Sequence, residues 1–177
     1  VEGLWDNALA RLQTDQTTKR TYVLIQFGHN DQPGKAERST DLTTEFPNNL
    51  TRYVQDSRAV GAIPVLVTPL TRRSFKAGVL QNDLRPWAEA TLRVARGNAV
   101  QAIDLNAVSY AAVAALGAPE ADTLAEEPPP SSPLPAGVKS RFDYTHVGAK
   151  GAAFFSRLMA KEIESQLPEL ARNLRGK

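Results

Sequence analysis

The chain has 177 residues, 42% of them hydrophobic and 23% charged, and its 21 basic and 19 acidic residues leave a formal charge of +2. This length favours a single domain with a sizeable core. The near balance of charge gives no reason to expect binding to nucleic acid or to an anionic membrane surface. No apolar run is long enough to span a bilayer. Because cysteine is absent, disulfides, thiolate zinc sites and cysteine nucleophiles are excluded.

Three short apolar runs predict β-strands. Residues 21–27 are rich in β-branched and aromatic side chains, and this composition is typical of a parallel-sheet strand buried on both faces. Residues 63–67 have the same character, and residues 99–105 are a weaker candidate.

Helical patterns lie before, between and after these runs. We expect helices from about Leu4, over 46–57, over 84–95, from a capping Asn106 to about Leu116, and over 149–166. Alternating strands and helices predict an α/β domain with a parallel sheet that covers residues 1–177. Residues 118–137 interrupt the pattern with six of the chain's 12 prolines, which predicts an exposed, acidic, Pro-rich loop.

Two polar clusters adjoin the predicted elements, and they contain the chain's only two histidines. Asn30 directly follows the first strand, where its amide can donate to a developing oxyanion. Asp143 precedes His146 by three residues, so its carboxylate can hold one ring nitrogen and leave the other as a general base. Because ligands bind at the carboxyl ends of parallel strands, we expect both clusters to reach one rim of the sheet.

Other residues near these clusters are open to more than one interpretation. His29 is expected to position its neighbours or the substrate rather than to catalyse. Asp31 is expected to bond loop amides and not a metal, since two histidines and scattered carboxylates match no known metal spacing. Arg72 and Arg73 follow the second strand and either bind uronate carboxylates or form a solvated basic turn. Asp143 alone is also typical of a helix cap.

In order, spacing and strand context, these motifs resemble the SGNH (GDSL-type) hydrolases, and within them the rhamnogalacturonan acetylesterase-like carbohydrate esterases. Residues 22–32 are similar to that family's third block, a strand followed by Gly-x-Asn-Asp. Residues 143–152 are similar to its fifth block, and 2–6 and 67–75 match further segments of the acetylesterase-like branch. The resemblance therefore covers nearly the whole chain.

The resemblance implies a flavodoxin-like, three-layer α/β/α fold and removal of O-acetyl groups from pectic plant cell-wall polysaccharide without metal or cofactor. It implies that Asn30 serves the oxyanion hole, that His146 is the base, and that Asp143 orients the histidine. Gly28 and Asp31 would shape the loop around Asn30. The same resemblance implies a secreted or periplasmic protein.

The family's nucleophile is not recognisable in the sequence. No serine follows a predicted strand in a Gly-Asp-Ser or Gly-x-Ser-x-Gly context; the serines are Ser39, Ser57, Ser74, Ser109, Ser131, Ser132, Ser140, Ser156 and Ser165. We therefore expect an N-terminally incomplete domain, with the strand at 21–27 left at a sheet edge. The alternatives are a non-catalytic carbohydrate-binding protein and an SGNH esterase or lipase that acts on non-sugar esters.

Overall fold

The computed structural model describes residues 3–14, 20–35, 37–127 and 142–174. The chain forms two compact units, one of Val1–Pro69 with Arg85–Asp104 and the other of Leu70–Leu84 with Leu105–Lys177. Each unit is built around its own hydrophobic cluster. Among the described ranges, no helix has the length and apolar character needed to cross a membrane.

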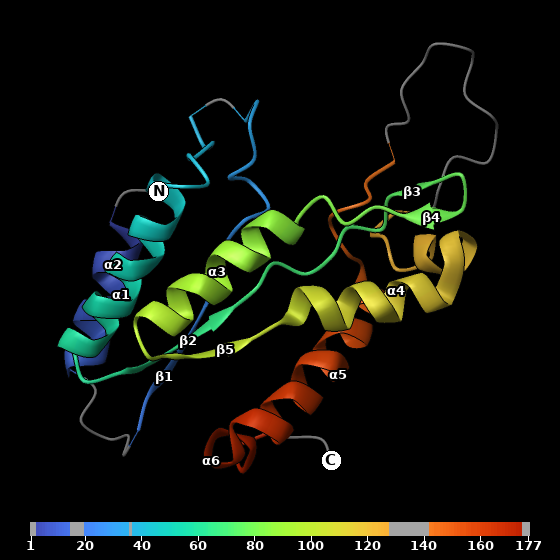
Figure 1. Ribbon diagram of the computed structural model, residues 1–177. Helices are drawn as coiled ribbons and strands as arrows, with labels where there is room; N and C mark the ends of the chain where they lie inside the picture. The colour runs from blue at the N-terminus through green and yellow to red at the C-terminus, as the bar shows by residue number, and fades with distance from the viewer. Residues whose placement is uncertain (1–2, 15–19, 36, 128–141, 175–177) are drawn as a thin grey trace. The chain divides into compact units, whose positions relative to one another are not determined.

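The first unit contains a parallel sheet with the strand order β1-β2-β5 (Figure 1). Its elements in chain order are α1 (Leu4–Thr14), β1 (Tyr22–Gln26), α2 (Glu45–Ala59), β2 (Ile63–Val67), α3 (Arg85–Gly97) and β5 (Gln101–Ile103). The three strands all fall on predicted runs, and a helix connects each strand to the next. The predicted α/β class with a parallel sheet is therefore confirmed.

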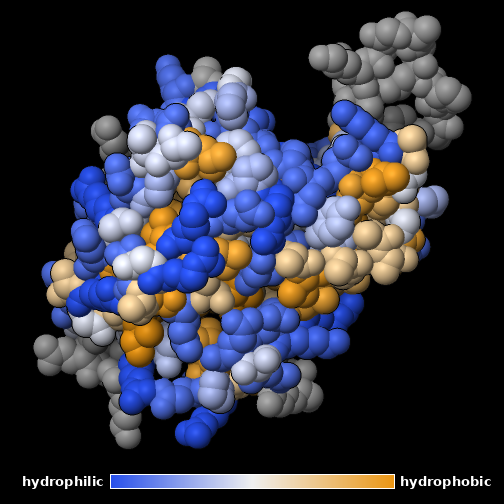
Figure 2. All heavy atoms as spheres, in the orientation of Figure 1, coloured by the Kyte–Doolittle hydropathy of each residue, from blue (hydrophilic) through white to orange (hydrophobic). Residues whose placement is uncertain are grey.

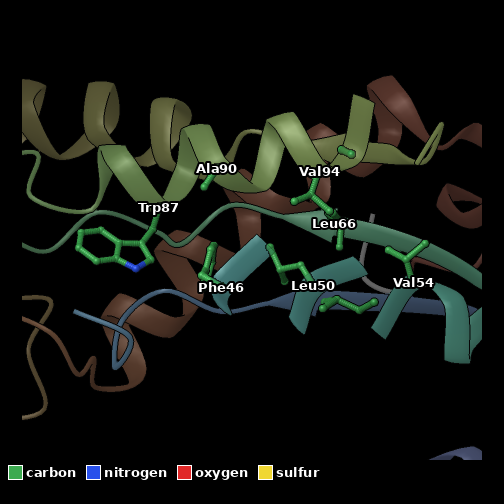
Figure 3. Packing of buried hydrophobic residues seen from close by; sticks show 9 residues of the cluster. Phe46, Leu50, Val54, Leu66, Trp87, Ala90 and Val94 are labelled. Atoms are coloured by element: carbon green, nitrogen blue, oxygen red, sulfur yellow. The ribbon is translucent and has the colours of Figure 1, made fainter. Parts of the chain in front are cut away.

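The core of this unit packs α2 and α3 against the central strand β2. Leu66 of β2 is fully buried. Figure 3 shows side chains from both helices turned toward this strand; they are Phe46, Leu50 and Val54 of α2 and Trp87, Ala90 and Val94 of α3. Their spacing of three or four residues gives each helix one apolar face. The predicted face of α2 contained Phe46, Leu50 and Val54, whereas the predicted face of α3 contained Trp87 but not Ala90 or Val94.

Strand β1 is less buried than its composition predicted. Only Ile25 is buried, while Leu24 is 41% exposed and the adjacent Phe27 is 42% exposed. Among the described strands, β1 pairs with β2 alone. The prediction of burial on both faces was wrong, because Leu24 and Gln26 on one face are exposed while Ile25 on the other face is buried. The prediction of an edge position is confirmed for the described sheet.

The second unit combines a short hairpin with helices. It contains β3 (Phe75–Lys76), β4 (Val79–Leu80), α4 (Leu105–Asp122), α5 (Ala149–Gln166) and α6 (Pro168–Ala171). The hairpin was not predicted, because two-residue strands leave no periodic pattern. Its turn residues Ala77 and Gly78 have φ angles of 47° and 78°, and positive values at both central positions suit a tight antiparallel connection.

Helix α4 departs from the prediction at both ends. It begins at Leu105, so Asn106 lies inside its first turn instead of capping it. Gly117 interrupts the helix with φ 73° and ψ 165°, and helical residues resume through Asp122. An exposed loop was predicted over residues 118–137, but residues 118–122 are helical and Ala121 is fully buried. Residues 128–137 of the predicted loop lie outside the described residues.

Figure 2 shows apolar surface along α4.

Replacing Gly28 with alanine is expected to destabilise the first unit. Gly28 is buried at φ 125°, and a Cβ there would lie 2.9 Å from Cγ of Pro69 and 3.2 Å from Cβ of Trp87. Backbone strain and overpacking predict a loss of about 2–3 kcal/mol in unfolding free energy, measurable by urea denaturation. Gly97→Ala is the control, because its Cβ would meet no atom within 4 Å; equal stability of the two variants would contradict the expectation.

Candidate active site

Asp143 and His146 form a hydrogen-bonded pair on the segment that leads into α5. Nδ1 of His146 lies 2.6 Å from Oδ2 of Asp143. The other carboxylate oxygen of Asp143 accepts the backbone N–H groups of Thr145 at 2.7 Å and of His146 at 2.9 Å. Because an ionised carboxylate only accepts, Nδ1 of the neutral imidazole carries the proton and Nε2 keeps a lone pair. The pair thus has the chemistry of an oriented general base.

The carboxyl of Asp143 remains ionised well into the acid range. Burial raises its pKa, but the hydrogen bonds from the His146 ring and from the N–H groups of His146 and Thr145 together lower the pKa to about 2. These donors favour the charged carboxylate. The side chain of His146 is 77% exposed, so this base is accessible from outside its unit.

The segment before α5 is fixed by a close approach to the backbone that follows α4. Gly148 donates its N–H to the carbonyl of Leu124 at 3.1 Å, and Ala125 and Val147 form a β-bridge. A Cβ at Gly148 would lie only 2.7 Å from the carbonyl oxygen of Ala125. Glycine is therefore needed here for space, and the contact sets the direction from which α5 begins at Ala149.

Arg73 bonds every carbonyl of the segment from Asp143 to His146. Its backbone N–H donates to the carbonyl of Tyr144 at 2.9 Å. Its Nη2 donates to the carbonyls of Asp143 at 2.7 Å and His146 at 2.9 Å, and Nη1 donates to that of Thr145 at 3.5 Å. One residue, distant in sequence, therefore holds the backbone that carries the acid and the base.

The prediction that Arg73 binds the substrate is wrong, because the residue is buried. The side chain is fully buried, and its bonded donors face backbone carbonyls of its own unit. Burial lowers the pKa of Arg73, and the charges of Asp143 and Asp122 oppose that shift. A solvated basic turn is equally wrong for this residue.

Arg72 also contacts the same segment, through a different atom. Its Nε donates to Oγ1 of Thr145 at 3.1 Å, and its guanidinium forms an ion pair with Asp83. The side chain is 13% exposed, so the interpretation as a solvated turn is wrong here too. Binding of a uronate carboxylate by Arg72 stays a prediction.

The loop that carries Asn30 belongs to the first unit and is held by Asp31. The carboxylate of Asp31 accepts the N–H of Gly28 at 2.9 Å and the hydroxyl of Thr40 at 3.1 Å, while its carbonyl accepts the N–H of Thr40 at 3.0 Å. The predicted bonding of Asp31 to a loop amide is thus confirmed. Asn30 is exposed beside it, and His29 is half-buried.

A hollow of about 610 Å³ lies beside this loop within the first unit. Phe27 and Asp31 contribute to its wall, together with the aromatic side chains of Trp5 and Tyr53. The ring of Tyr53 stacks on Phe27 and meets Trp5 edge-on, with ring centroids 5.0 Å and 4.8 Å apart. This cluster was not predicted, because its members come from three separate segments of the chain.

Several of the serines in the described residues lie inside helices, and these residues form no metal site. Ser57 and Ser109 are fully buried inside helices, and the hydroxyl of Ser109 accepts the N–H of Thr71 at 2.9 Å. Ser156 lies within α5, and Ser131, Ser132 and Ser140 lie outside the described residues. In the same described part, no three His, Asp or Glu side chains group in a way that could hold a metal ion.

Comparisons with known proteins identify two similar enzymes of Bacillus subtilis strain 168, whereas no protein-family model matches the chain. The chain is 35% identical over 159 residues to rhamnogalacturonan acetylesterase RhgT, covering 87% of this chain and 66% of that enzyme. It is 33% identical over 144 residues to the probable rhamnogalacturonan acetylesterase YesY, covering 81% and 62%. The chain thus spans slightly less than two thirds of the length of these relatives.

Solved structures agree on the fold. The protein YXIM of Bacillus subtilis superposes with a TM-score of 0.67 at 23% identity, over 89% of this chain and 40% of that one. A catalytic mutant of the acetylxylan esterase Axe2 from Geobacillus stearothermophilus gives 0.54 at 17% identity, over 90% and 67%. At these identities the likeness concerns the α/β fold alone. The chain is thus similar in sequence to two enzymes named as rhamnogalacturonan acetylesterases, and it shares the α/β fold of these solved structures.

Proposed function

We propose that this chain is part of a serine esterase that removes O-acetyl groups from pectic, rhamnogalacturonan-like polysaccharide. The observation that carries the proposal is the Asp143–His146 pair, in which a carboxylate fixes one ring nitrogen at 2.6 Å. The substrate class comes from the names of the two relatives, both called rhamnogalacturonan acetylesterases. Neither a metal nor a cofactor enters the proposed reaction.

In the proposed mechanism, His146 takes a proton from a serine hydroxyl through Nε2 while the serine oxygen attacks the acetyl carbonyl carbon. Asp143 stabilises the imidazolium that forms. Asn30 donates its side-chain amide to the oxyanion of the tetrahedral intermediate. The imidazolium then protonates the sugar oxygen as its bond to the acetyl carbon breaks, which leaves an acetyl-serine. Water, deprotonated by the same histidine, attacks the acetyl carbon, and acetate leaves as the serine oxygen takes the proton back.

The proposal assigns the nucleophile to a serine of the whole protein outside these 177 residues. Its support is that no serine of the chain follows a strand in a nucleophile motif, and that Ser57 and Ser109 are buried in helices. A Gly-Asp-Ser after a strand, roughly 50–70 residues upstream as two βα units require, is expected in the native gene. Its absence would favour a non-catalytic carbohydrate-binding protein.

Two substitutions in the whole protein test the assigned roles. His146→Ala is expected to abolish hydrolysis of an aryl acetate with the fold intact, because no base remains to activate the nucleophile. Asn30→Ala is expected to lower kcat about 100- to 1,000-fold through loss of one oxyanion donor. Asn48→Ala, another exposed asparagine of the first unit, is the control for the latter.

Steady-state kinetics with circular dichroism as a check on folding measures both effects. Near-normal turnover of the His146→Ala protein would contradict the proposal. Preference for acetylated rhamnogalacturonan over longer-chain aryl esters is expected, and the reverse preference would point to a non-sugar substrate.

The ionised Asp143 should also make the free energy of unfolding depend on pH. Its pKa is about 2 in the folded chain, against an ordinary value of 3.8. A lowered pKa means that the carboxylate stabilises the fold above about pH 4, and that this contribution is lost as pH falls from about 4 toward 2. The stability gap between the parent and Asp143→Asn is therefore expected to narrow over that range.

Urea denaturation at a series of pH values measures this gap. Asp41→Asn is a matched comparison, because hydrogen bonds from Thr43 and Thr44 also lower the pKa of Asp41 to about 2. Both variants should show the narrowing, but only Asp143→Asn should impair ester hydrolysis. A gap for Asp143→Asn that does not change with pH would count against an ionised, hydrogen-bonded carboxylate.

A further inference from the structure

We propose that Arg73 is a positioning residue that holds the Asp143–His146 segment in its working conformation. This inference rests on the proposed function for its catalytic consequence, but its structural content stands on the second unit alone. Arg73 contacts neither the reacting ring nitrogen nor the carboxylate oxygens in any bond of the described structure. It acts through the backbone between them.

The polar groups of the segment are divided between two side chains of opposite charge. The carboxylate of Asp143 accepts the N–H groups of Thr145 and His146. The side chain of Arg73 donates to the carbonyls of Asp143, Thr145 and His146, and its backbone N–H donates to that of Tyr144. The backbone conformation is thus determined from both sides, and either contact alone would leave half of its polar groups without this support.

A guanidinium suits this task better than an ammonium group. Its planar fork spreads donors over two terminal nitrogens. Here Nη2 bonds two carbonyls and Nη1 approaches a third. A lysine would carry the same charge on one nitrogen at the end of a flexible stem, and it would not reproduce the spacing of these donors.

The burial of Arg73 shows that the contact is built into the unit. The side chain has no exposed surface, and its charge is balanced by neighbouring carboxylates of Asp143 and Asp122, both of which act on it electrostatically. Asp122 lies at the end of α4.

The catalytic consequence follows from the geometry of the pair. The bond from Nδ1 of His146 to Asp143 spans only three residues, so the direction of the imidazole depends on the backbone that Arg73 holds. A displacement of about 1 Å at a reacting group can cost about 100-fold in rate. Loss of the fork is therefore expected to lower kcat while leaving KM nearly unchanged, since Arg73 is too deeply buried to touch the substrate.

The experiment replaces Arg73 with lysine and with methionine in the whole protein. Arg58 supplies matched controls, because its Nη2 also donates to two backbone carbonyls, those of Asn98 and Ala99, in the first unit. Hydrogen exchange at the amides of Thr145 and His146 is measured for all four variants, together with kcat and KM for an aryl acetate.

Exchange at these two amides should accelerate in Arg73→Lys and further in Arg73→Met, and kcat should fall about 100-fold in the methionine variant with partial recovery in the lysine variant. The Arg58 variants should change neither quantity. Unchanged exchange in Arg73→Lys, or a loss confined to KM, would overturn the proposal. If Arg73→Met fails to fold, hydrogen exchange in the Arg73→Lys variant tests the proposal. A parent without esterase activity would refute the proposed function alone, because the exchange measurement still tests the positioning.

Discussion

The second unit buries one guanidinium and bonds its two terminal nitrogens to backbone carbonyls, while its Nε has no hydrogen-bond partner among the described residues. Removing a charged group from water costs several kcal/mol, and the cost is offset only where hydrogen bonds and opposite charges replace the lost hydration. The carbonyls of Asp143, Thr145 and His146 do this for Arg73, with two carboxylates nearby. A segment of irregular backbone thereby gains a fixed conformation without belonging to a helix or a sheet.

The loop that carries Asn30 and the segment that carries His146 are each held by an aspartate in the same way. In each, an aspartate bonds a backbone N–H three residues away, from Asp31 back to Gly28 and from Asp143 forward to His146. An ionised carboxylate is a strong acceptor and stabilises a tight loop. In both cases the side chain assigned to chemistry, Asn30 or His146, stays exposed. The aspartates thus hold the loop backbone, while the side chains of Asn30 and His146 remain exposed.

How much the sequence predicted depended on how local each feature is. Strand β2 and helix α5 matched their predicted bounds, because an apolar run or a helical stripe reports on its own segment. The Asp143–His146 bond was also local, at three residues' separation. The exposure of Leu24 was not predicted, since burial of a strand depends on its neighbours and not on its own composition.

Features that join distant segments escaped prediction for the same reason. Arg73 lies about 70 residues before the carbonyls it bonds. Two basic residues after a strand do not show by themselves whether a side chain is buried against the backbone or exposed to bind a substrate. The continuation of α4 was missed because Gly117 and Pro119 indicate a break. Proline is in fact tolerated in the first turn of a helix, where its missing N–H has no partner to lose, so the helix resumes after the glycine.

The central claim is that the amide of Asn30 and the imidazole of His146 act on the same acetyl group. The most direct measurement is a crystal structure of the whole protein inactivated by an aryl phosphonate, whose adduct imitates the tetrahedral intermediate. We expect Nδ2 of Asn30 and Nε2 of His146 both to lie about 3 Å from oxygens of that adduct. An adduct that only one of them contacts, with the other on a remote face of the molecule, would contradict it.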